Sequence, residues 1–126
     1  MKRHAMGAWG EEQALKKLKS LGYQFRDRNW HATTGEIDLI LEDRGEVVFV
    51  EVKTRSSGRF GRPEDGLTPR KKASILQAAL AYLDVHDLWE VSWRVDVVAI
   101  ECTSNGKLKR MDHYVNVNME PGELPV

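Results

Sequence analysis

Two apolar stretches of the sequence carry charged residues at positions where a buried strand normally has none. They are Gly35-Glu36-Ile37-Asp38-Leu39-Ile40 and Val48-Phe49-Val50-Glu51-Val52-Lys53. Burying a charge without a partner is costly, so something must neutralise these acids. Carboxylate oxygens are hard ligands that suit Mg²⁺ or Mn²⁺. The residue types therefore indicate a divalent-cation site.

A tight turn at Arg44-Gly45 would join the two stretches as an antiparallel hairpin. Asp43 would then lie opposite Glu46, Asp38 opposite Glu51, and Glu36 opposite Lys53. Side chains alternate along a strand, so the four charged residues of the motif would share one face. The opposite face would carry Ile37, Leu39, Leu41, Val48, Val50 and Val52. Opposed carboxylates repel one another, and a cation between them reverses the sign of that interaction.

The length of the turn decides whether this site exists. Arg-Gly is a weaker signal for a two-residue turn than Asn-Gly. A three-residue loop at Asp43-Arg44-Gly45 would place Asp38 and Glu51 on opposite faces. The sequence leaves both alternatives open.

A helix over residues 8–21 is expected before the motif, because Leu15, Leu18 and Leu21 recur at helical spacing. Glu11 and Glu12 would lie in its first turn, where the helix dipole favours negative charge. Glu11 could instead point inward beside the apolar stripe. Both interpretations of Glu11 are open at this level.

The other predicted elements give the order α-β-β-β-α-β-β. Strands are expected over residues 23–30, in both halves of the hairpin and over 91–100, and residues 107–118 are expected to return as a last strand or a ragged edge. Thr68-Pro69 begins a second helix that extends to about residue 85. Arg94 and Asp96 would share a face, as a mutual salt bridge or at a sheet edge. We expect an α/β protein with one domain over residues 1–118 and a flexible tail over 119–126.

Basic residues gather after the motif, although the chain has 19 basic and 19 acidic side chains and no net charge. The balance argues against a purely electrostatic nucleic-acid binder. The region from 53 to 72 nevertheless carries Lys53, Arg55, Arg59, Arg62, Arg70, Lys71 and Lys72. The segment 54–67 could be an ordinary solvated loop, but it leaves directly from Lys53, which favours phosphate contact. Positive charge in the first turn of the second helix opposes the dipole, so helix stability does not explain it.

The rest of the composition narrows the class of protein. No apolar run approaches the length that crosses a bilayer, and the first six residues have no hydrophobic core of the signal-peptide kind, so a cytoplasmic protein is expected. The single cysteine, Cys102, excludes an internal disulfide and a cysteine-based zinc cluster.

Gln77, within the second helix, could reach the site or face solvent.

The order Asp, about a dozen residues, then Glu-x-Lys resembles the PD-(D/E)xK nuclease superfamily through Asp38 and Glu51-Val52-Lys53. A larger ordered set, covering about residues 7 to 101, resembles the YraN family of small bacterial proteins. Its motifs are Gly10-Glu11, Asn29-Trp30, Gly35 to Ile40, Phe49 to Arg55, Phe60-Gly61 and Arg94 to Ile100. The usual proline of the first half-motif is absent, with Glu36-Ile37 before Asp38.

This resemblance implies a restriction-endonuclease-like fold, with a central mixed sheet flanked by helices, similar to archaeal Holliday-junction resolvases. It implies that Asp38 and Glu51 hold Mg²⁺ or Mn²⁺ and that Glu11 completes the metal shell. Lys53 would orient water or stabilise charge on the phosphate, with Glu36 and Gln77 as weaker candidates. The expected activity is cleavage of DNA, more than RNA, including branched DNA. A homodimer is one alternative, since resolving a symmetric junction takes two active sites.

Two other interpretations compete with the nuclease. The chain could be a nucleic-acid-binding or assembly module that retains the nuclease fold without turnover. The acids and lysine could also form a structural salt-bridge cluster, in which case magnesium would not bind.

Overall fold

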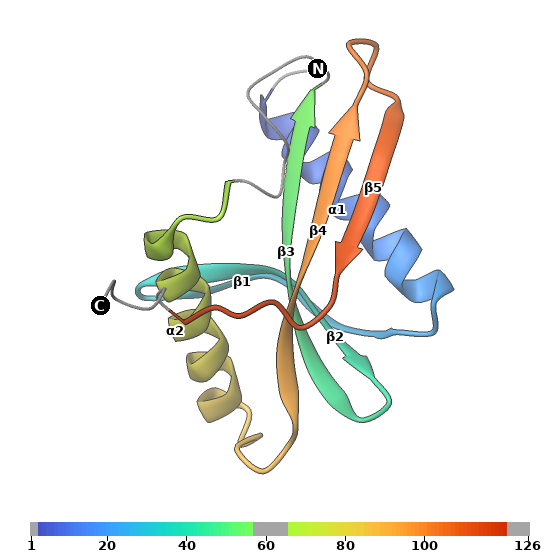
Figure 1. Cartoon of the computed structure of the whole chain (residues 1–126). Helices are drawn as coiled ribbons and strands as arrows, with labels where there is room; N and C mark the ends of the chain where they lie inside the picture. The colour runs from blue at the N-terminus through green and yellow to red at the C-terminus, as the bar shows by residue number, and fades with distance from the viewer. Residues whose placement is uncertain (1–2, 57–65, 121–126) are drawn as a thin grey trace, which may run out of the picture.

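The computed structural model describes residues 3–56 and 66–120, with side chains of the first helix from residue 5 onward. The elements are α1 (Arg3–Ser20), β1 (Gln24–Ala32), β2 (Gly35–Asp43), β3 (Glu46–Ser56), α2 (Pro69–Val85), β4 (Trp93–Cys102) and β5 (Leu108–Tyr114). This order confirms the predicted α/β class (Figure 1). Within the described ranges, no helix is both long enough and apolar enough to span a bilayer.

The five strands form one mixed sheet in the order β1-β2-β3-β4-β5. β3 and β4 are parallel, and every other neighbouring pair is antiparallel. Parallel neighbours need a long crossover connection, and α2 supplies it. Arg94 and Asp96 lie on β4, an interior strand, where they form a salt bridge of 3.0 Å. The salt-bridge alternative is therefore confirmed, and the ladder between β4 and β5 begins only at Val97, one residue beyond Asp96.

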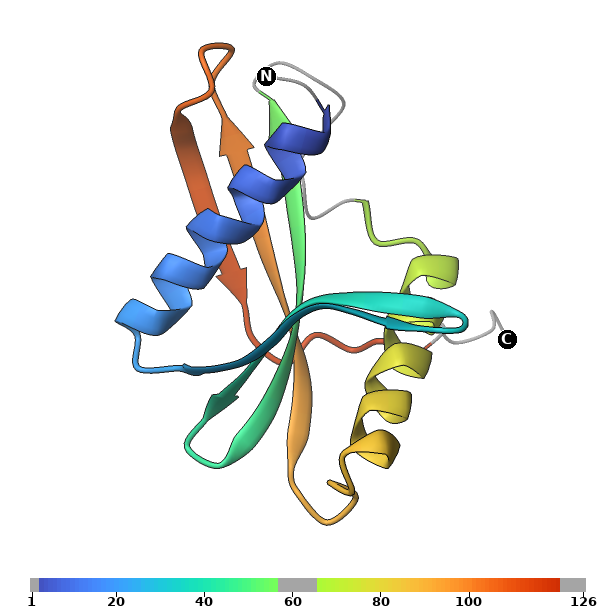
Figure 2. The ribbon, with the colours of Figure 1, turned by 180° about the vertical axis from the view of Figure 1, so that it is seen from behind.

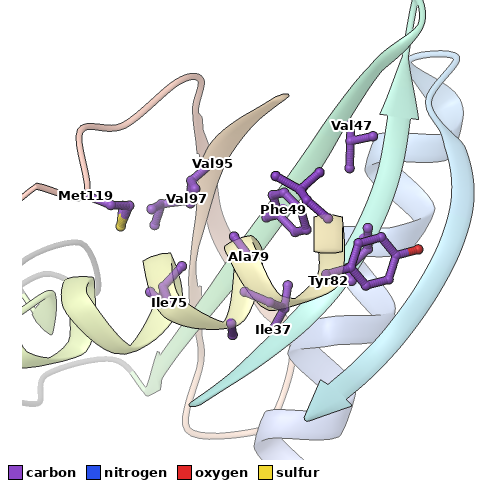
Figure 3. Packing of buried hydrophobic residues seen from close by; sticks show 12 residues of the cluster. Ile37, Val47, Phe49, Ile75, Ala79, Tyr82, Val95, Val97 and Met119 are labelled. Carbon is purple, nitrogen blue, oxygen red and sulfur yellow. The ribbon is translucent and has the colours of Figure 1, made fainter. Parts of the chain in front are cut away.

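The two helices cover opposite faces of the sheet (Figures 1 and 2). The apolar stripe of α1 packs with one set of strand residues, namely Leu39, Leu41, Val48, Val50, Val98 and Ile100. Residues of α2 pack on the other face with Ile37, Ile40, Val47, Phe49, Val95 and Val97. Tyr82 of α2 meets Phe49 edge to face, with ring centroids 5.7 Å apart (Figure 3). The central strands β2, β3 and β4 thus form a buried middle layer that can hold side chains in fixed positions.

The first helix begins at Arg3 and not at residue 8, so the predicted start is wrong. The sulfur atoms of Met6 and Cys102 lie 3.9 Å apart, so α1 already contacts the sheet before the expected start. Glu11 and Glu12 consequently lie in the middle of α1, and its first turn holds no acid. The dipole of a helix acts within its first and last turns, so it does not account for these two acids.

The C-terminal segment is packed further than expected. The N–H of Val117 donates to the carbonyl of Val95 at 2.8 Å, and Met119 is buried in the α2-side core. Met119 was expected to begin the flexible tail, and its burial means that the packed chain reaches at least this residue. The remainder of the predicted tail, residues 121–126, lies outside the described residues.

Candidate functional site

The turn between β2 and β3 has two residues. Asp43 pairs with Glu46, and the ladder continues in the same register to Leu39 and Val50. Arg44 and Gly45 both have positive φ, at 52° and 80°, as a tight hairpin turn requires. The two-residue alternative is therefore correct, and the next positions in this register are Asp38 and Glu51.

The backbone ladder between β2 and β3 gives way to a side-chain contact at this point. Oδ2 of Asp38 accepts a hydrogen bond of 2.8 Å from the N–H of Val52. The residues Asp38 and Glu51 are only 9% and 4% exposed. Two buried carboxylates from neighbouring strands are thus held side by side.

The strand β2 changes direction at the same place. The β1–β2 ladder passes from Arg28 opposite Leu39 to Trp30 opposite Ile37, and the intervening Asn29 has a positive φ of 49°. Beyond this point the side-chain alternation is broken, because Ile37 packs on the α2 side and Leu39 on the α1 side. The prediction that Ile37 and Leu39 share a face is therefore wrong.

Glu36 lies at the rim of the site and not opposite Lys53. The β2–β3 ladder ends at Leu39, and Glu36 pairs instead with His31 on β1. Its carboxylate lies 3.2 Å from Nδ1 of His31, and its side chain is 45% exposed. Its charge nevertheless contributes to the raised pKa of Asp38, so Glu36 belongs to the surroundings of the acid pair.

Two lysines from different elements meet the acid pair. Nζ of Lys53 lies 3.7 Å from Oε1 of Glu51, as the Glu-x-Lys motif suggested. Nζ of Lys71 lies 3.5 Å from the same oxygen. Lys71 comes from the first turn of α2, where its N–H donates to the capping hydroxyl of Thr68 at 3.1 Å. From the sequence, Lys71 was expected to contact phosphate. The only signal of a further role was its positive charge in the first turn of α2, where the helix dipole disfavours positive charge.

Burial and mutual repulsion shift the acids toward their protonated forms. Burial, followed by the charge of Asp38, raises the pKa of Glu51 to about 7. Burial also raises the pKa of Asp38, although the Val52 N–H and the charge of Lys71 oppose that shift. The lysines oppose these shifts without cancelling them, because burial disfavours the charged form of each acid.

Glu11 reaches the same region from α1. Burial raises the pKa of Glu11, and the charge of Asp38 adds to the effect. A hydrogen bond from the side chain of Asn29 works in the opposite direction. Glu12 is exposed and lies 3.4 Å from Arg28. Of the two acids, Glu11 faces the pair and Glu12 faces solvent.

Two glycines permit the close approach of both helices. A Cβ atom on Gly10 would lie 2.0 Å from Oγ1 of Thr54 on β3, so only glycine lets α1 lie this close. A Cβ atom on Gly35 would lie 2.4 Å from the carbonyl oxygen of Ser74 on α2. The hydroxyl of Ser74 also donates to the carbonyl of Thr34 at 3.0 Å. These contacts position Glu11 and Lys71 from opposite faces of the sheet.

The acid pair has the chemistry that a hard divalent cation requires. Asp38 and Glu51 supply buried carboxylate oxygens, and burial together with the repulsion of neighbouring acids raises their pKa values. In the described parts of the chain, no three His, Cys, Asp or Glu side chains surround one point. Mg²⁺ commonly takes only one or two carboxylates and keeps several waters. The residues therefore fit a two-carboxylate site, with Glu11 near its edge.

The remaining candidates are dispersed around the site. Arg55 is partly buried, and its guanidinium would lie 3.2 Å from a Cβ on Gly66. Arg70 and Lys72 flank Lys71 in the first turn of α2. Gln77 is exposed, and the structure records no contact between it and the acids within the described ranges. Arg59 and Arg62 lie outside the described residues.

A third buried carboxylate, Asp96 on β4, belongs to a separate network. It is fully buried and accepts hydrogen bonds from Nε of Arg94 at 3.0 Å and the N–H of Asn116 at 2.9 Å. Nε2 of His113 lies 2.8 Å from its other oxygen. Although burial opposes it, these partners lower the pKa of Asp96. Sequence reasoning assigned no role to His113, because the pairing of β4 with β5 is needed to bring it here.

The fold and the site define a mixed α/β protein with an acidic site between the central strands and one helix on each face. Comparison with known proteins places the chain within one family. Residues 10–100 match the family described as "Uncharacterised protein family UPF0102". The chain belongs to this family, which confirms the YraN part of the resemblance.

Relatives from distant bacteria are similar over almost the whole chain, and each is called a UPF0102 protein. The protein from Syntrophomonas wolfei is 43% identical over 111 residues, covering 88% of this chain and 95% of the relative. The one from Chlorobium phaeobacteroides is 38% identical over 120 residues, covering 92% and 95%. The one from Beutenbergia cavernae is 40% identical over 115 residues, covering 91% and 97%. The relatives carry no other description, so membership of the PD-(D/E)xK nuclease superfamily stays a prediction.

Proposed function

We propose that this protein is a Mg²⁺- or Mn²⁺-dependent nuclease of the PD-(D/E)xK superfamily that hydrolyses phosphodiester bonds of DNA in the cytoplasm. The observation that carries the proposal is the buried pair of Asp38 and Glu51, held side by side and faced by Lys53 and Lys71. Buried acids with raised pKa values that gather in one place are typical of functional sites.

Each residue of the site has a distinct task in this reaction. Asp38 and Glu51 hold the cation, and the hydrogen bond from Val52 fixes the orientation of Asp38. Glu11 adjusts the metal shell from α1. When bound, the metal polarises a phosphoryl oxygen and activates a water molecule. Lys53 orients that water and stabilises the negative charge that grows on the phosphate.

The basic residues around the site supply the contact with the nucleic-acid backbone. Arg55 follows Lys53 on β3, and Arg70 and Lys72 extend from the start of α2, the element that also brings Lys71 to Glu51. Positive side chains beside a phosphodiesterase site neutralise phosphates and release counterions. Branched DNA is included in the proposal as a candidate substrate, and a panel of DNA shapes tests it.

A non-catalytic nucleic-acid-binding module is the alternative, and one observation favours it. Lys53 and Lys71 already engage the same oxygen of Glu51, and Asp38 already uses one oxygen for Val52. Under this alternative the lysines replace the metal. DNA affinity would then fall with salt, and no divalent cation would support cleavage.

The deciding experiment is a cleavage assay on linear, flapped and four-way DNA with Mg²⁺ or Mn²⁺. The parent should cut in the presence of metal, whereas Asp38→Asn and Glu51→Gln should not. Glu42→Gln is the matched control, because Glu42 lies on β2 but pairs with Arg26 away from the site. Equal cleavage by the parent and both site variants would sink the proposal. DNA binding without cleavage under every metal would establish the alternative.

A further inference from the structure

One oxygen of Glu51 is shared by two lysines whose attachments differ. Lys53 lies two residues from Glu51 on the same strand, and 19% of its side chain is exposed. Lys71 belongs to the first turn of α2, a separate element, and 32% of its side chain is exposed. Lys53 therefore stays beside Glu51 because both residues belong to β3, whereas Lys71 can move toward solvent by changing its side-chain rotamer.

Two ammonium groups already face the acid pair. When Asp38 and Glu51 are both ionised, their two negative charges equal the two positive charges of Lys53 and Lys71, and Glu11 is a further acid at the edge of the site. A divalent cation at the acid pair would bring two more positive charges beside these ammonium groups in a poorly solvated place. One ammonium group must then move away, or an anion must arrive, because like charges at this distance repel strongly.

We propose that the ammonium group of Lys71 occupies the cation position of the acid pair in the metal-free protein and leaves it when the metal binds. This inference rests on the proposed function and adds a mechanism of regulation to it. Once displaced, Lys71 stays anchored in the first turn of α2 beside Arg70 and Lys72. There it contributes to binding a phosphate of the nucleic acid.

The exchange couples metal binding to nucleic-acid binding. Without nucleic acid, the metal must displace Lys71 into solvent, and its affinity is weakened accordingly. With nucleic acid present, a phosphate receives the displaced ammonium group, and both ligands bind more tightly. Such coupling is reciprocal, so each ligand strengthens the other by the same factor.

Calorimetric titration of Mn²⁺ without nucleic acid tests the exchange directly. Lys71→Met and Lys71→Gln should bind Mn²⁺ roughly tenfold more tightly than the parent, within the usual range for coupled sites. Lys71→Arg keeps the charge and should restore affinity close to that of the parent. Lys72→Met is the matched control, because it removes the same charge from the next residue of α2 and should change Mn²⁺ affinity far less. Circular dichroism melts verify that each variant is folded.

The possible results separate this inference from the proposed function. Tighter Mn²⁺ binding by Lys71→Met, with little change in Lys72→Met, supports the exchange even if the parent itself binds too weakly to measure. If the parent binds Mn²⁺ and Lys71→Met binds equally or more weakly, the exchange is overturned and the nuclease proposal stands. If neither the parent nor any Lys71 variant binds Mn²⁺, both the exchange and the proposed metal-dependent nuclease are overturned.

Discussion

Oδ2 of Asp38 accepts a hydrogen bond from the backbone N–H of Val52 at 2.8 Å, directly beside Glu51. The carboxylate takes the place of a backbone partner at the point where the β2–β3 ladder ends. A site residue therefore also maintains the sheet, and its replacement must be chosen to separate these two roles.

Asp38→Asn separates them, because the amide oxygen of asparagine can still accept from Val52. The negative charge is lost, and that charge is the second cause of the raised pKa of Glu51, after burial. We expect the pKa of Glu51 to fall below about 7 in this variant. Carbon-detected NMR titration of the Glu51 carboxyl group measures the shift directly. An unchanged pKa would mean that the two acids do not interact.

The pH dependence of stability provides a second prediction. Glu51 keeps its proton up to about pH 7 in the folded state, but an unfolded glutamate releases it near 4.5. The folded state therefore binds more protons between these values, and stability falls as pH rises through this window. The loss should be on the order of 2 to 3 kcal/mol. Urea unfolding from pH 5 to pH 8 should show it in the parent.

Glu51→Gln removes this loss, since glutamine does not ionise, and it should be more stable than the parent at pH 8. Glu42→Gln serves as the control, because Glu42 is a partly exposed acid paired with Arg26, and it should retain the parent's pH dependence. A Glu51→Gln protein that loses stability from pH 5 to pH 8 as steeply as the parent would contradict the assignment.

Glu11 and its neighbour Glu12 allow a matched test of the contribution from α1. Glu11 faces Asp38, whereas Glu12 is exposed beside Arg28. Glu11→Gln should weaken Mn²⁺ binding roughly 10- to 100-fold, as is usual for groups that support metal ligands. Glu12→Gln should leave binding near the parent value. Calorimetry measures both, and equal effects would indicate that only long-range charge matters.

Gly10 and Gly7 test the approach of α1 to the sheet. A Cβ on Gly10 meets Thr54 at 2.0 Å, whereas a Cβ on Gly7 meets nothing within 4 Å. Gly10→Ala should destabilise the protein by about 1 to 3 kcal/mol through overpacking. Gly7→Ala should stabilise it by up to about 1 kcal/mol, because alanine is the better helix former.

Urea unfolding measures both glycine variants. Adding Thr54→Ala to Gly10→Ala removes the nearest clashing atom and should recover part of the loss. The absence of any recovery would show that the contact with Thr54 is not what restricts this position.

The Asp96 network predicts a structural effect away from the site. Asp96→Ala leaves Arg94 without its buried partner and should cost about 3 kcal/mol or more. Asp43→Ala is the control, because Asp43 contacts the same arginine from a 25% exposed position and should cost less than about 1 kcal/mol. Both are measured by urea unfolding at pH 7.

Acid pH provides an independent check of the same network. The lowered pKa of Asp96 means that its stabilisation is present above the unfolded pKa and disappears as pH falls through the folded value. The difference between the parent and Asp96→Ala should therefore shrink at strongly acid pH. A difference that stays constant would mean that the charge of Asp96 is not what stabilises the fold.

The order of the elements was predictable, and the sequence offered the juxtaposition of Asp38 and Glu51 as one of two alternatives, because both depend on local signals. Alternating apolar residues specify strands, and Thr68-Pro69 begins α2 where a capping residue and proline should. A two-residue turn brings its flanking strands together within a few residues, so the register needed no distant contact. Only the choice between two turn lengths required the structure.

Contacts between distant elements could not be read from the sequence. Lys71 reaches Glu51 only because Gly35 lets α2 lie against the start of β2, and Glu11 faces Asp38 only because Gly10 lets α1 approach β3. Periodicity states which face of an element is apolar, but it does not state how closely two elements pack or where a strand bends. The sequence by itself therefore determined the order of the strands and helices and identified Asp38 and Glu51 as candidate site residues. The tertiary structure decided that the two acids lie side by side and that Lys71 and Glu11 meet them, because close packing depends on many residues at once.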